Sequence, residues 1–491
     1  MTIGGMALPP MHIGTMGPEI VLLVAGLLVL LVALFFREGE GTGLLAGIGV
    51  AGILVALGWT FFLWGSPEPA YAFGRSFVAD HASLILDWTI LLSALAGILV
   101  VGRDIEISPD FVALTLWSAI GMMVMAGAND LIVLFLGLEI LSLPLYILAA
   151  FHPRRETSLE AAVKYFLLGA FSSGFFLFGL AMLYGATGTT NIQAIAGILT
   201  GAAGHGSLST LLVDVGAGLI VVGLGFKLAL VPFHMWAPDV YEGAPTSVTT
   251  FMSVGVKAAA FGALARLVLV AVPLGVLPWQ PVLEALALIT ILAGALLSLP
   301  QTNLKRLLAY SSVLNAGYLA AALSTQSALG LASGLYFMVA YAFMNLGAFA
   351  VVAALSTDRD EGADLAAYRG LFYRQPYVAL AMAIFLFALA SIPPTAGFVA
   401  KFYILESLVA GSDLPLAIGL VLGTAITLYV YLRPIISMFQ RDERDARPVR
   451  RIPVAMAVLL AVLAVGVIEI GIDPGEIVHL VHVSTGVMTG L

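Results

Sequence analysis

Residues 223–245 read GLGFKLALVPFHMWAPDVYEGAP, which places a lysine, a proline and a histidine in an otherwise apolar run. An ammonium group near the centre of a bilayer costs at least ~2.5 to 3.5 kcal/mol, so Lys227 indicates a functional position. Pro232 follows five residues later. Proline removes a helical hydrogen bond, which at membrane depth is tolerated only against protein or a water-lined cavity. The stretch therefore predicts a hydrated ion path beside a broken membrane helix.

The composition places the chain among integral membrane proteins. Of its 491 residues, 61% are hydrophobic and 10% are charged, against about 25% charged in soluble globular proteins. The mean hydropathy is +1.05. Cysteine is absent, which excludes disulfides, thiolate metal sites, iron-sulfur clusters and cysteine nucleophiles. The net charge of -8 excludes the basic surface that binding to nucleic acid requires.

Apolar runs of about 20 residues, the length that crosses a ~30 Å hydrocarbon core, recur through the chain. There are fourteen, at residues 18–36, 43–64, 82–102, 109–126, 129–150, 160–185, 211–233, 246–271, 279–299, 306–323, 326–355, 376–408, 414–437 and 452–471. The run 376–408 is too long for one straight helix and contains Pro393 and Pro394, so we expect two half-helices around a break. The sequence thus predicts an all-α polytopic membrane protein with fourteen transmembrane helices.

The cations fall almost entirely on one side of this predicted topology. With the N-terminus outside, the loops facing the cytoplasm hold fourteen Lys and Arg, and the outer loops hold one, Arg75. The fourteen are Arg37, Arg103, Arg154, Arg155, Lys305, Arg306, Arg359, Arg369, Arg374, Arg441, Arg444, Arg447, Arg450 and Arg451. Cytoplasmic loops of membrane proteins carry an excess of Lys and Arg. We therefore expect both the N-terminus and the C-terminus on the outer side.

The two predicted helix breaks indicate internal repetition, because Pro232 and Pro393 lie 161 residues apart. Interrupted helices in corresponding positions of two halves are typical of transporter ion pathways. We expect three N-terminal helices in residues 1–108, five-helix repeats in residues 109–271 and 279–437, and a C-terminal helix and tail in residues 438–491. Since five is an odd number of spans, the second repeat is expected to be inverted relative to the first.

Three lysines are left for the membrane interior once loop cations and those near span ends are assigned, and they are Lys227, Lys257 and Lys401. Glu139 lies about ten residues into its span and so near mid-depth. Opposite charges that share a dry site each favour the other's ionised form. A Glu139–Lys227 pair that opens and closes would therefore act as a proton switch.

Each candidate also has a structural interpretation. Glu139 can be a protonated carboxyl that is hydrogen-bonded inside the bundle, Lys257 can cap carbonyls freed by a broken neighbour, and Lys401 can extend to the membrane surface. His234 follows the break and either relays protons or caps freed carbonyls. Glu406 does not share the helix face of Lys401 and is not assigned a role.

Other polar residues stay open at this stage. One helix carries a polar stripe, which favours helix packing or support of water; it consists of Tyr310, Ser311, Ser312, Asn315 and Tyr318. Asp239 and Glu242 follow the first break and are either a proton entrance or ordinary solvated acids. Asp87 has no assigned role, and no spacing of His205, His479 and His482 indicates a metal site.

Three stretches together resemble one known family. They are LGLEILSLPLYILAAF at 136–151, GFKLALVPFHMWAPDVYEGAPT at 225–246 and LKRLLAYSSVLNAGY at 304–318. They resemble the subunit N family of the proton-pumping NADH-quinone oxidoreductase, respiratory complex I, whose mitochondrial counterpart is subunit 2. The resemblance covers essentially the whole chain, although the third stretch is shared with Mrp-type cation/proton antiporters. A lysine at position 401, where larger siblings have glutamate, favours the N-type subunit.

The resemblance implies a role for each candidate. Glu139 and Lys227 would form the switching pair, Lys257 the central lysine and Lys401 the terminal lysine of the other half-channel, and His234 matches the motif and would join the relay. No cofactor is expected in this chain, because NADH, FMN, iron-sulfur clusters and quinone belong to other subunits. The expected partners are other membrane subunits of complex I, including neighbouring antiporter-like subunits, in a bacterial inner membrane with both termini periplasmic.

Two other functions remain open from the sequence. One is a subunit of an Mrp-like monovalent cation/proton antiporter, which would exchange Na⁺ for protons without the rest of complex I. The other is a membrane scaffold whose lysines only hold helices together. One glutamate and three lysines at membrane depth are an unusual cost for packing alone, which favours proton translocation.

Overall fold

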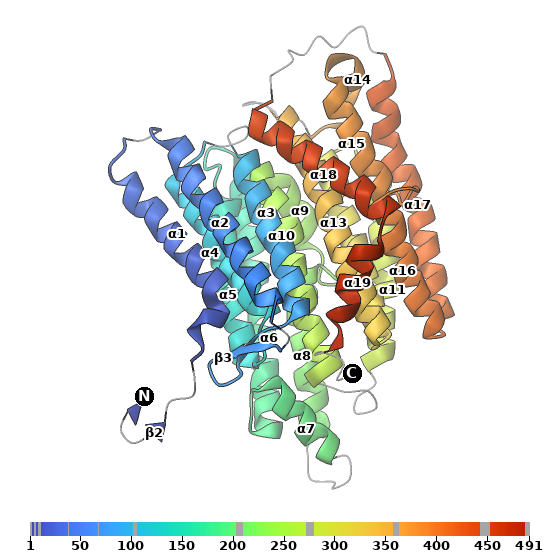
Figure 1. Ribbon diagram of the computed structural model, residues 1–491. Helices are drawn as coiled ribbons and strands as arrows, with labels where there is room; N and C mark the ends of the chain where they lie inside the picture. The colour runs from blue at the N-terminus through green and yellow to red at the C-terminus, as the bar shows by residue number, and fades with distance from the viewer. Residues whose placement is uncertain are drawn as a thin grey trace.

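The computed structural model describes residues 2–3, 6–7, 11–37, 39–66, 68–101, 106–202, 210–271, 279–356, 363–441 and 452–486. These residues form one bundle of long helices (Figure 1). The long helices are α1 (Gly17–Ala33), α2 (Thr42–Trp64), α3 (His81–Val100), α4 (Pro109–Ala126), α5 (Leu131–Ala149), α6 (Glu156–Thr187), α8 (Thr210–Leu228), α10 (Thr246–Arg266), α11 (Trp279–Ser298), α12 (Leu304–Ser324), α13 (Ala328–Leu355), α17 (Leu414–Phe439) and α18 (Val454–Ile472).

Shorter elements join or extend these helices. The short helices are η1 (Ile13–Met16), α7 (Ile192–Ala202), α9 (Trp236–Gly243), the π-helical turn η2 (Leu267–Ala271), η3 (Leu365–Tyr368), α14 (Leu371–Arg374), α15 (Pro376–Leu389), α16 (Ala396–Ala410) and α19 (Gly475–Val483). Two antiparallel two-stranded sheets pair β1 (Thr2–Ile3) with β2 (Met6–Ala7) and β3 (Ala70–Ala72) with β4 (Phe77–Ala79).

Thirteen helices among the described residues are long and apolar enough to cross a membrane. The prediction of an all-helical membrane protein is therefore confirmed, with thirteen candidate spans where fourteen runs were expected. The difference lies in the run 376–408, which forms α15 and α16 with residues 390–395 between them. Neither of these two helices reaches 18 residues, so neither counts as a span alone.

Several helices begin where a short polar side chain accepts a backbone N–H, which satisfies one of the four unpaired donors at a helix start. Asp80 accepts from the backbone of Ser83 at the start of α3, and Asp130 accepts from Ile132 at the start of α5. Ser327 does the same for Gly330 at the start of α13. These caps end the apolar runs at defined residues.

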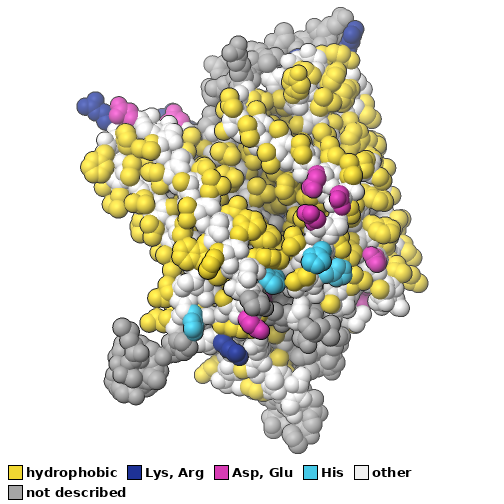
Figure 2. Space-filling model, viewed as in Figure 1, with side chains coloured by type: hydrophobic (Ala, Val, Ile, Leu, Met, Phe, Trp, Pro, Cys, Tyr) yellow, Lys and Arg dark blue, Asp and Glu magenta, His cyan; other side chains and the backbone are white. Residues whose placement is uncertain are grey.

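Burial separates the helices that line the interior from those that face the surroundings. In α12, 94% of the most apolar 18-residue window is buried, although this is the least hydropathic of the thirteen spans, whereas 39% is buried in the window that covers α1. The polar stripe of α12 is therefore inside the protein. Figure 2 shows hydrophobic side chains over most of the visible face, with Lys and Arg at its ends.

Both predicted helix breaks are present, and they share one hydrogen-bonding pattern. After α8, Ala229 has a φ of 65°, and the N–H of Leu230 donates to Gly225 O at 2.8 Å. After α15, Ser391 has a φ of 61°, and the N–H of Ile392 donates to Phe387 O at 3.0 Å. The two patterns are 162 residues apart (391 - 229 and 392 - 230).

This offset corrects the spacing expected from the sequence. Adding 162 to Pro232 gives Pro394, whereas the sequence comparison paired Pro232 with Pro393 at a spacing of 161. Both Pro232 and Pro394 follow a cis peptide bond. The sequence contains two adjacent prolines and cannot show which one holds the equivalent place.

A second correspondence comes from close helix crossings. A Cβ added at Gly121 of α4 would lie 2.2 Å from the backbone N of Leu141 in α5, and one added at Gly294 of α11 would lie 2.6 Å from the backbone N of Leu314 in α12. Both members of the pair differ by 173 residues (294 - 121 and 314 - 141). Adding 173 to 139 gives 312, so Ser312 holds the place in α12 that Glu139 holds in α5.

Gly121→Ala is expected to destabilise the protein by about 1–3 kcal/mol, because the added methyl group forces the backbones of α4 and α5 apart. Gly58→Ala is the matched control, since no heavy atom lies within 4 Å of a Cβ at this helical glycine. Thermal denaturation of the assembled protein in detergent, with native gels, measures both. Equal melting temperatures for the two variants would show that the α4–α5 contact is not tight.

Part of the predicted cation pattern lies outside the described residues, namely Arg103, Arg359, Arg444, Arg447, Arg450 and Arg451, and so does His205. The structure contains no membrane. The orientation of the termini therefore stays a prediction, and so do the domain boundaries.

Candidate functional site

Lys227 lies in the last turn of α8 and is 1% exposed. Its Nζ donates a hydrogen bond to the Oγ of Ser142 in α5 at 2.7 Å. The ammonium group also lies 5.4 Å from the ring centroid of Tyr146 and 5.2 Å from that of Tyr165. The lysine is therefore held by one hydroxyl and by the faces of aromatic rings, which attract a cation within about 6 Å.

Glu139 lies on α5 one turn before Ser142 and is partly exposed. Its Oε1 is buried and has no hydrogen-bond partner among the described residues, and no ion pair joins it to Lys227 within the described part of the chain. The structure thus brings the two predicted partners to adjacent positions but places Ser142 as the direct contact. The Oγ of Ser142 itself donates to Leu138 O.

Lys257 and Lys401 occupy equivalent kinds of position beside the two helix breaks. The Nζ of Lys257 donates to Leu228 O, in the last residue of α8, at 2.7 Å. The Nζ of Lys401 donates to Leu389 O, in the last residue of α15, at 3.1 Å. The capping contact considered for Lys257 is present. Lys401 is 4% exposed, so it does not extend to the membrane surface.

A series of buried hydroxyl and amide groups lies between these two lysines, and we call it the polar axis. Its hydrogen bonds are Asn345 Nδ2 to Ser253 Oγ at 2.7 Å, Tyr341 OH to Ser312 Oγ at 3.0 Å, Ser311 Oγ with Tyr431 OH at 2.5 Å, Asn315 Nδ2 to Ser311 Oγ at 3.4 Å, and Tyr318 OH with Thr424 Oγ1 at 3.0 Å.

The ends of the polar axis meet the lysines. Ser253 is one turn before Lys257 on α10, and Lys401 Nζ lies 4.9 Å from the ring centroid of Tyr318. The axis crosses from α10 through α13 and α12 to α17. Hydroxyl and amide groups donate and accept hydrogen bonds, so the axis can support a proton path between the lysines.

His234 is only partly buried and lies between the first break and α9. Its Nδ1 has no hydrogen-bond partner among the described residues. The described hydrogen bonds do not join its ring to Lys227, so its predicted part in the relay gains no direct contact from the structure.

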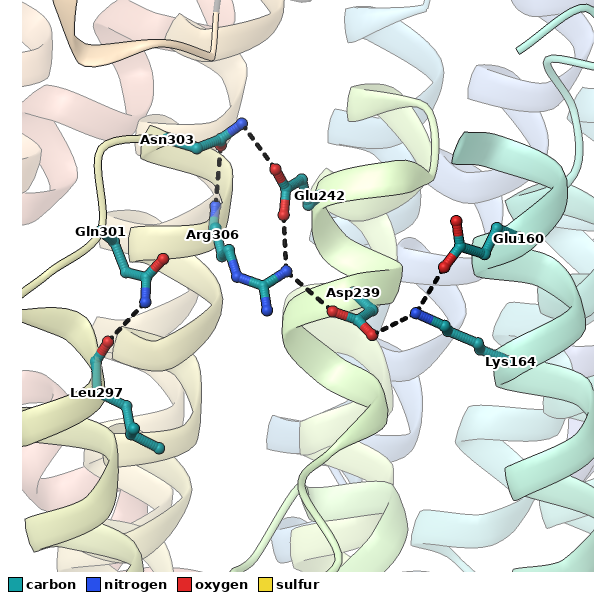
Figure 3. A network of polar contacts seen from close by, with 8 residues as sticks. All are labelled: Glu160, Lys164, Asp239, Glu242, Leu297, Gln301, Asn303 and Arg306. Atoms are coloured by element: carbon teal, nitrogen blue, oxygen red, sulfur yellow. Dashed lines mark hydrogen bonds and ion pairs between the residues drawn. The ribbon is translucent and has the colours of Figure 1, made fainter. Parts of the chain in front are cut away.

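A network of ion pairs binds α9 between α6 and α12 (Figure 3). Asp239 accepts from Lys164 of α6 at 2.7 Å and from Arg306 of α12 at 2.9 Å. Arg306 also pairs with Glu242 at 2.8 Å, and Lys164 pairs with Glu160 at 2.7 Å. The acids after the break are therefore not simply solvated.

This network lines an open cavity of about 470 Å³. The lining includes Arg155, Glu160, Lys164, Asp239, Glu242, Arg306 and Asp364. The cavity brings charged groups to the end of the protein at which α9 joins α10.

Asp239→Asn is expected to lower stability by about 0.5–2 kcal/mol, because it removes two half-exposed ion pairs that each contribute about 0.2–1 kcal/mol. Glu160→Gln is the matched control, since it removes a single exposed pair with Lys164 within one helix and is expected to cost at most about 0.5 kcal/mol. Melting temperatures of the two variants, at low and high salt, measure the difference. A larger loss for Glu160→Gln would contradict the bridging role of Asp239.

Several polar contacts could not be found from the sequence. Ser142, Asn345 and Tyr341 are single polar residues in apolar runs, which give no signal of a shared path. The bidentate contact of Arg266 with Asp80, at 2.9 Å to each oxygen, joins residues 186 positions apart. Their only local signal is that Asp80 begins a helix.

Comparisons with known proteins agree with this arrangement. The family described as NADH:quinone oxidoreductase/Mrp antiporter, TM, matches residues 128–427. NADH-quinone oxidoreductase subunit N 1 of Symbiobacterium thermophilum is 42% identical over 95% of this chain and 97% of its own, and subunit N of Chloroflexus aggregans is 40% identical over 99% of both. A chain of respiratory complex I from Thermus thermophilus with bound aureothin is similar in structure, with a TM-score of 0.81 and 34% identity over 94% of this chain and 98% of that chain.

The matches extend over both helix breaks, all three buried lysines and the polar axis. They also agree with the absence of cysteine, since the family lacks redox centres. The chain therefore belongs to the subunit N family of NADH-quinone oxidoreductase and to the proton-translocating membrane part of respiratory complex I.

Proposed function

We propose that this chain moves protons through a relay of Glu139, Lys227, Lys257 and Lys401 with intervening water, with His234 beside the first break. The observation that carries the proposal is the set of three lysines, each at most 4% exposed, joined through hydroxyl and amide groups. Among the described residues, no carboxylate forms an ion pair with any of the three.

The neutral partners of the lysines suit a group that must release and regain a proton. Burial without an opposite charge disfavours the charged form of any amine, whereas a permanent ion pair would hold the proton in place. Ser142, Leu228 O and Leu389 O are neutral acceptors. Each can bind the ammonium form and still allow the neutral amine when charge is withdrawn nearby.

The route would begin at the cavity around Asp239 and Glu242. A proton would pass to Lys227 while Glu139 moves toward or away from it, then to Lys257, then along the polar axis to Lys401. Each lysine accepts one proton as it gives up another, so no charge accumulates in the membrane. Electron transfer in other subunits would drive the switch through the position of Glu139.

We propose fourteen spans, with α15 and α16 together as the broken one, and two inverted repeats at 109–271 and 279–437. The shared hydrogen-bonding pattern at the breaks and the paired glycine crossings support the repeats. The helices of residues 1–108 and the segment 438–491 flank them. The distribution of Lys and Arg supports a periplasmic position for both termini in a bacterial inner membrane.

The proposed partners are the other membrane subunits of complex I, including neighbouring antiporter-like subunits. NADH, FMN, iron-sulfur clusters and quinone would be bound by other subunits. The names of the relatives support this division of labour. So does the lack of cysteine, which supplies the thiolates that usually hold iron-sulfur clusters.

A second candidate is a subunit of an Mrp-like cation/proton antiporter, because the matching family includes both kinds of protein. Exchange of Na⁺ for protons by this chain alone, in vesicles without other subunits, would favour it. Identity near 40% over nearly full length to subunit N proteins favours complex I.

The proposal is tested by proton pumping in membrane vesicles whose assembled complex carries a single lysine substitution, scored against NADH oxidation in the same vesicles. Loss of pumping with assembly intact supports the relay. Unchanged pumping after substitution of each lysine contradicts it and supports a scaffold.

A further inference from the structure

Three carboxyl groups that the relay does not use are buried near the start of α3. Glu19 in the first turn of α1 is 3% exposed, Asp80 at the N-cap of α3 is 2% exposed, and Asp87 in the second turn of α3 is 4% exposed. One cation lies among them, Arg266 at the end of α10, which is 3% exposed. The cluster therefore contains more acids than bases.

The single arginine is committed to one of the acids. Its Nη2 donates to both carboxyl oxygens of Asp80 at 2.9 Å, and its Nε donates to Ala126 O at 2.9 Å. Glu19 Oε2 and Asp87 Oδ1 have no hydrogen-bond partner among the described residues. Asp87 interacts electrostatically with Glu19, Asp80 and Arg266, so these two acids lie close enough to repel each other when ionised.

Two carboxylates without a cation cannot both stay ionised in an apolar interior. They need either a bound cation or a proton. In the described part of the chain, no group of three or more His, Cys, Asp or Glu has the arrangement of a metal site. One proton shared between Glu19 and Asp87 satisfies the charge.

The cluster lies beside the helix that carries Lys257. The helices α3 and α10 touch along their length: a Cβ at Gly255 would lie 2.8 Å from Ser93 Oγ, and a Cβ at Gly262 would lie 2.6 Å from Leu86 Cδ1. Lys257 stands between these two glycines on α10, and Asp87 follows Leu86 on α3. Asp87 is thus displaced from Lys257 toward Arg266 along the α3–α10 contact.

Buried hydroxyls continue along the same contact. Thr89 and Ser93 of α3 are at most 3% exposed and lie between the level of Asp87 and that of Gly255. In the other direction, Thr15 is one turn before Glu19 and lines an open cavity of about 410 Å³ with His12, Tyr71 and Arg75. Figure 1 shows β3 and the start of α1 at the same end of the bundle.

We propose that Asp87 and Glu19 share one proton and form an outward branch of the proton route, through which a proton from Lys257 reaches the outer surface without passing Lys401. This inference rests on the proposed relay. A proton leaves the Nζ of Lys257, which becomes the neutral amine, and passes through water to a carboxylate oxygen of Asp87. Glu19 then releases one proton to the cavity at Thr15, so the pair keeps a single proton throughout.

The test uses the assembled complex with Asp87→Asn or Glu19→Gln, and with Asp110→Asn as the control. Asp110 is an exposed acid in the first turn of α4 and belongs to neither route. The readouts are the number of protons pumped per electron in proteoliposomes and the infrared carbonyl absorption of protonated carboxylic acids. We expect Asp87→Asn and Glu19→Gln each to remove or shift one carbonyl band and to lower the proton-to-electron ratio, with both quantities unchanged in Asp110→Asn.

Two results would overturn the branch. One is an unchanged carbonyl spectrum in both variants with the complex assembled, and the other is an unchanged proton-to-electron ratio. If Asp87→Asn does not assemble, Glu19→Gln alone decides, because Glu19 makes no ion pair among the described residues. Lys257→Arg in the same preparation separates the two proposals: if it uncouples pumping while the acid variants do not, the branch is wrong and the relay stands.

Discussion

Lys257→Arg is expected to leave the complex assembled and to stop coupled proton pumping. Arginine can still donate to Leu228 O, the acceptor that Lys257 caps at 2.7 Å, so the end of α8 keeps its partner. A guanidinium, however, is not deprotonated in proteins. We expect pumping to fall by at least about tenfold, since a positioned proton donor or acceptor contributes about 10²- to 10⁴-fold to a transfer step.

The chain offers a matched control in Lys305. Its side chain is buried, and its Nζ donates to Ala244 O, at the C-cap of α9, at 2.7 Å. It is therefore also a buried lysine that caps a carbonyl, but it lies outside the polar axis and the cavity lining. Lys305→Arg is expected to keep the ratio of pumping to NADH oxidation, measured in the same membrane vesicles. If both arginine variants pump normally, Lys257 is a structural cap.

Lys227→Ala and Glu139→Gln are each expected to lower pumping and NADH oxidation by about tenfold or more, on the same scale for positioned proton-transfer groups. Lys227 loses its contact with Ser142, and Glu139 loses the charge that acts on the lysine. Two residues that act as one switch are not additive. The double variant is therefore expected to be no more than about twofold worse than the weaker single variant.

Native gels and pumping assays on all four members of this cycle check the prediction. Ser142→Ala is a useful fifth variant, because it removes the direct partner of Lys227 and leaves both charges in place. We expect it to retain most of the pumping. Multiplied effects in the double variant would show that Glu139 and Lys227 act independently.

Much of the fold could be predicted from the sequence, because apolar runs of span length are the strongest signal that a membrane protein carries. The ends of α2, α4, α5 and α17 lie within a few residues of the predicted runs. Both breaks were found because proline removes a backbone donor. The register of the second break differed by one residue, since two adjacent prolines are equally able to mark it.

The partners of the buried charges could not be predicted in the same way. An ammonium at depth signals its own importance, but its acceptor is fixed by how separate helices pack. Lys257 finds Leu228 O at a distance of 29 residues, and Lys227 finds Ser142 at 85. Leu228 carries no polar side chain, so nothing in the sequence marks its carbonyl as an acceptor.

The contrast between Glu139 and Asp87 shows the same limit. Glu139 lies in a stretch that resembles a known family, so a role could be assigned to it. Asp87 lies in no such stretch, and only the three-dimensional structure shows that it shares a buried site with Glu19 while Arg266 is held by Asp80. Charge balance in a buried cluster is a property of the packed helices.

The most direct test of the relay is the number of protons pumped per electron by purified, reconstituted complex that carries Lys257→Arg, measured beside Lys305→Arg in identical proteoliposomes. The account predicts a strongly lowered ratio for Lys257→Arg and an unchanged ratio for Lys305→Arg, with both complexes fully assembled. An unchanged ratio for Lys257→Arg would contradict proton transfer through this lysine and would leave it the role of a helix cap.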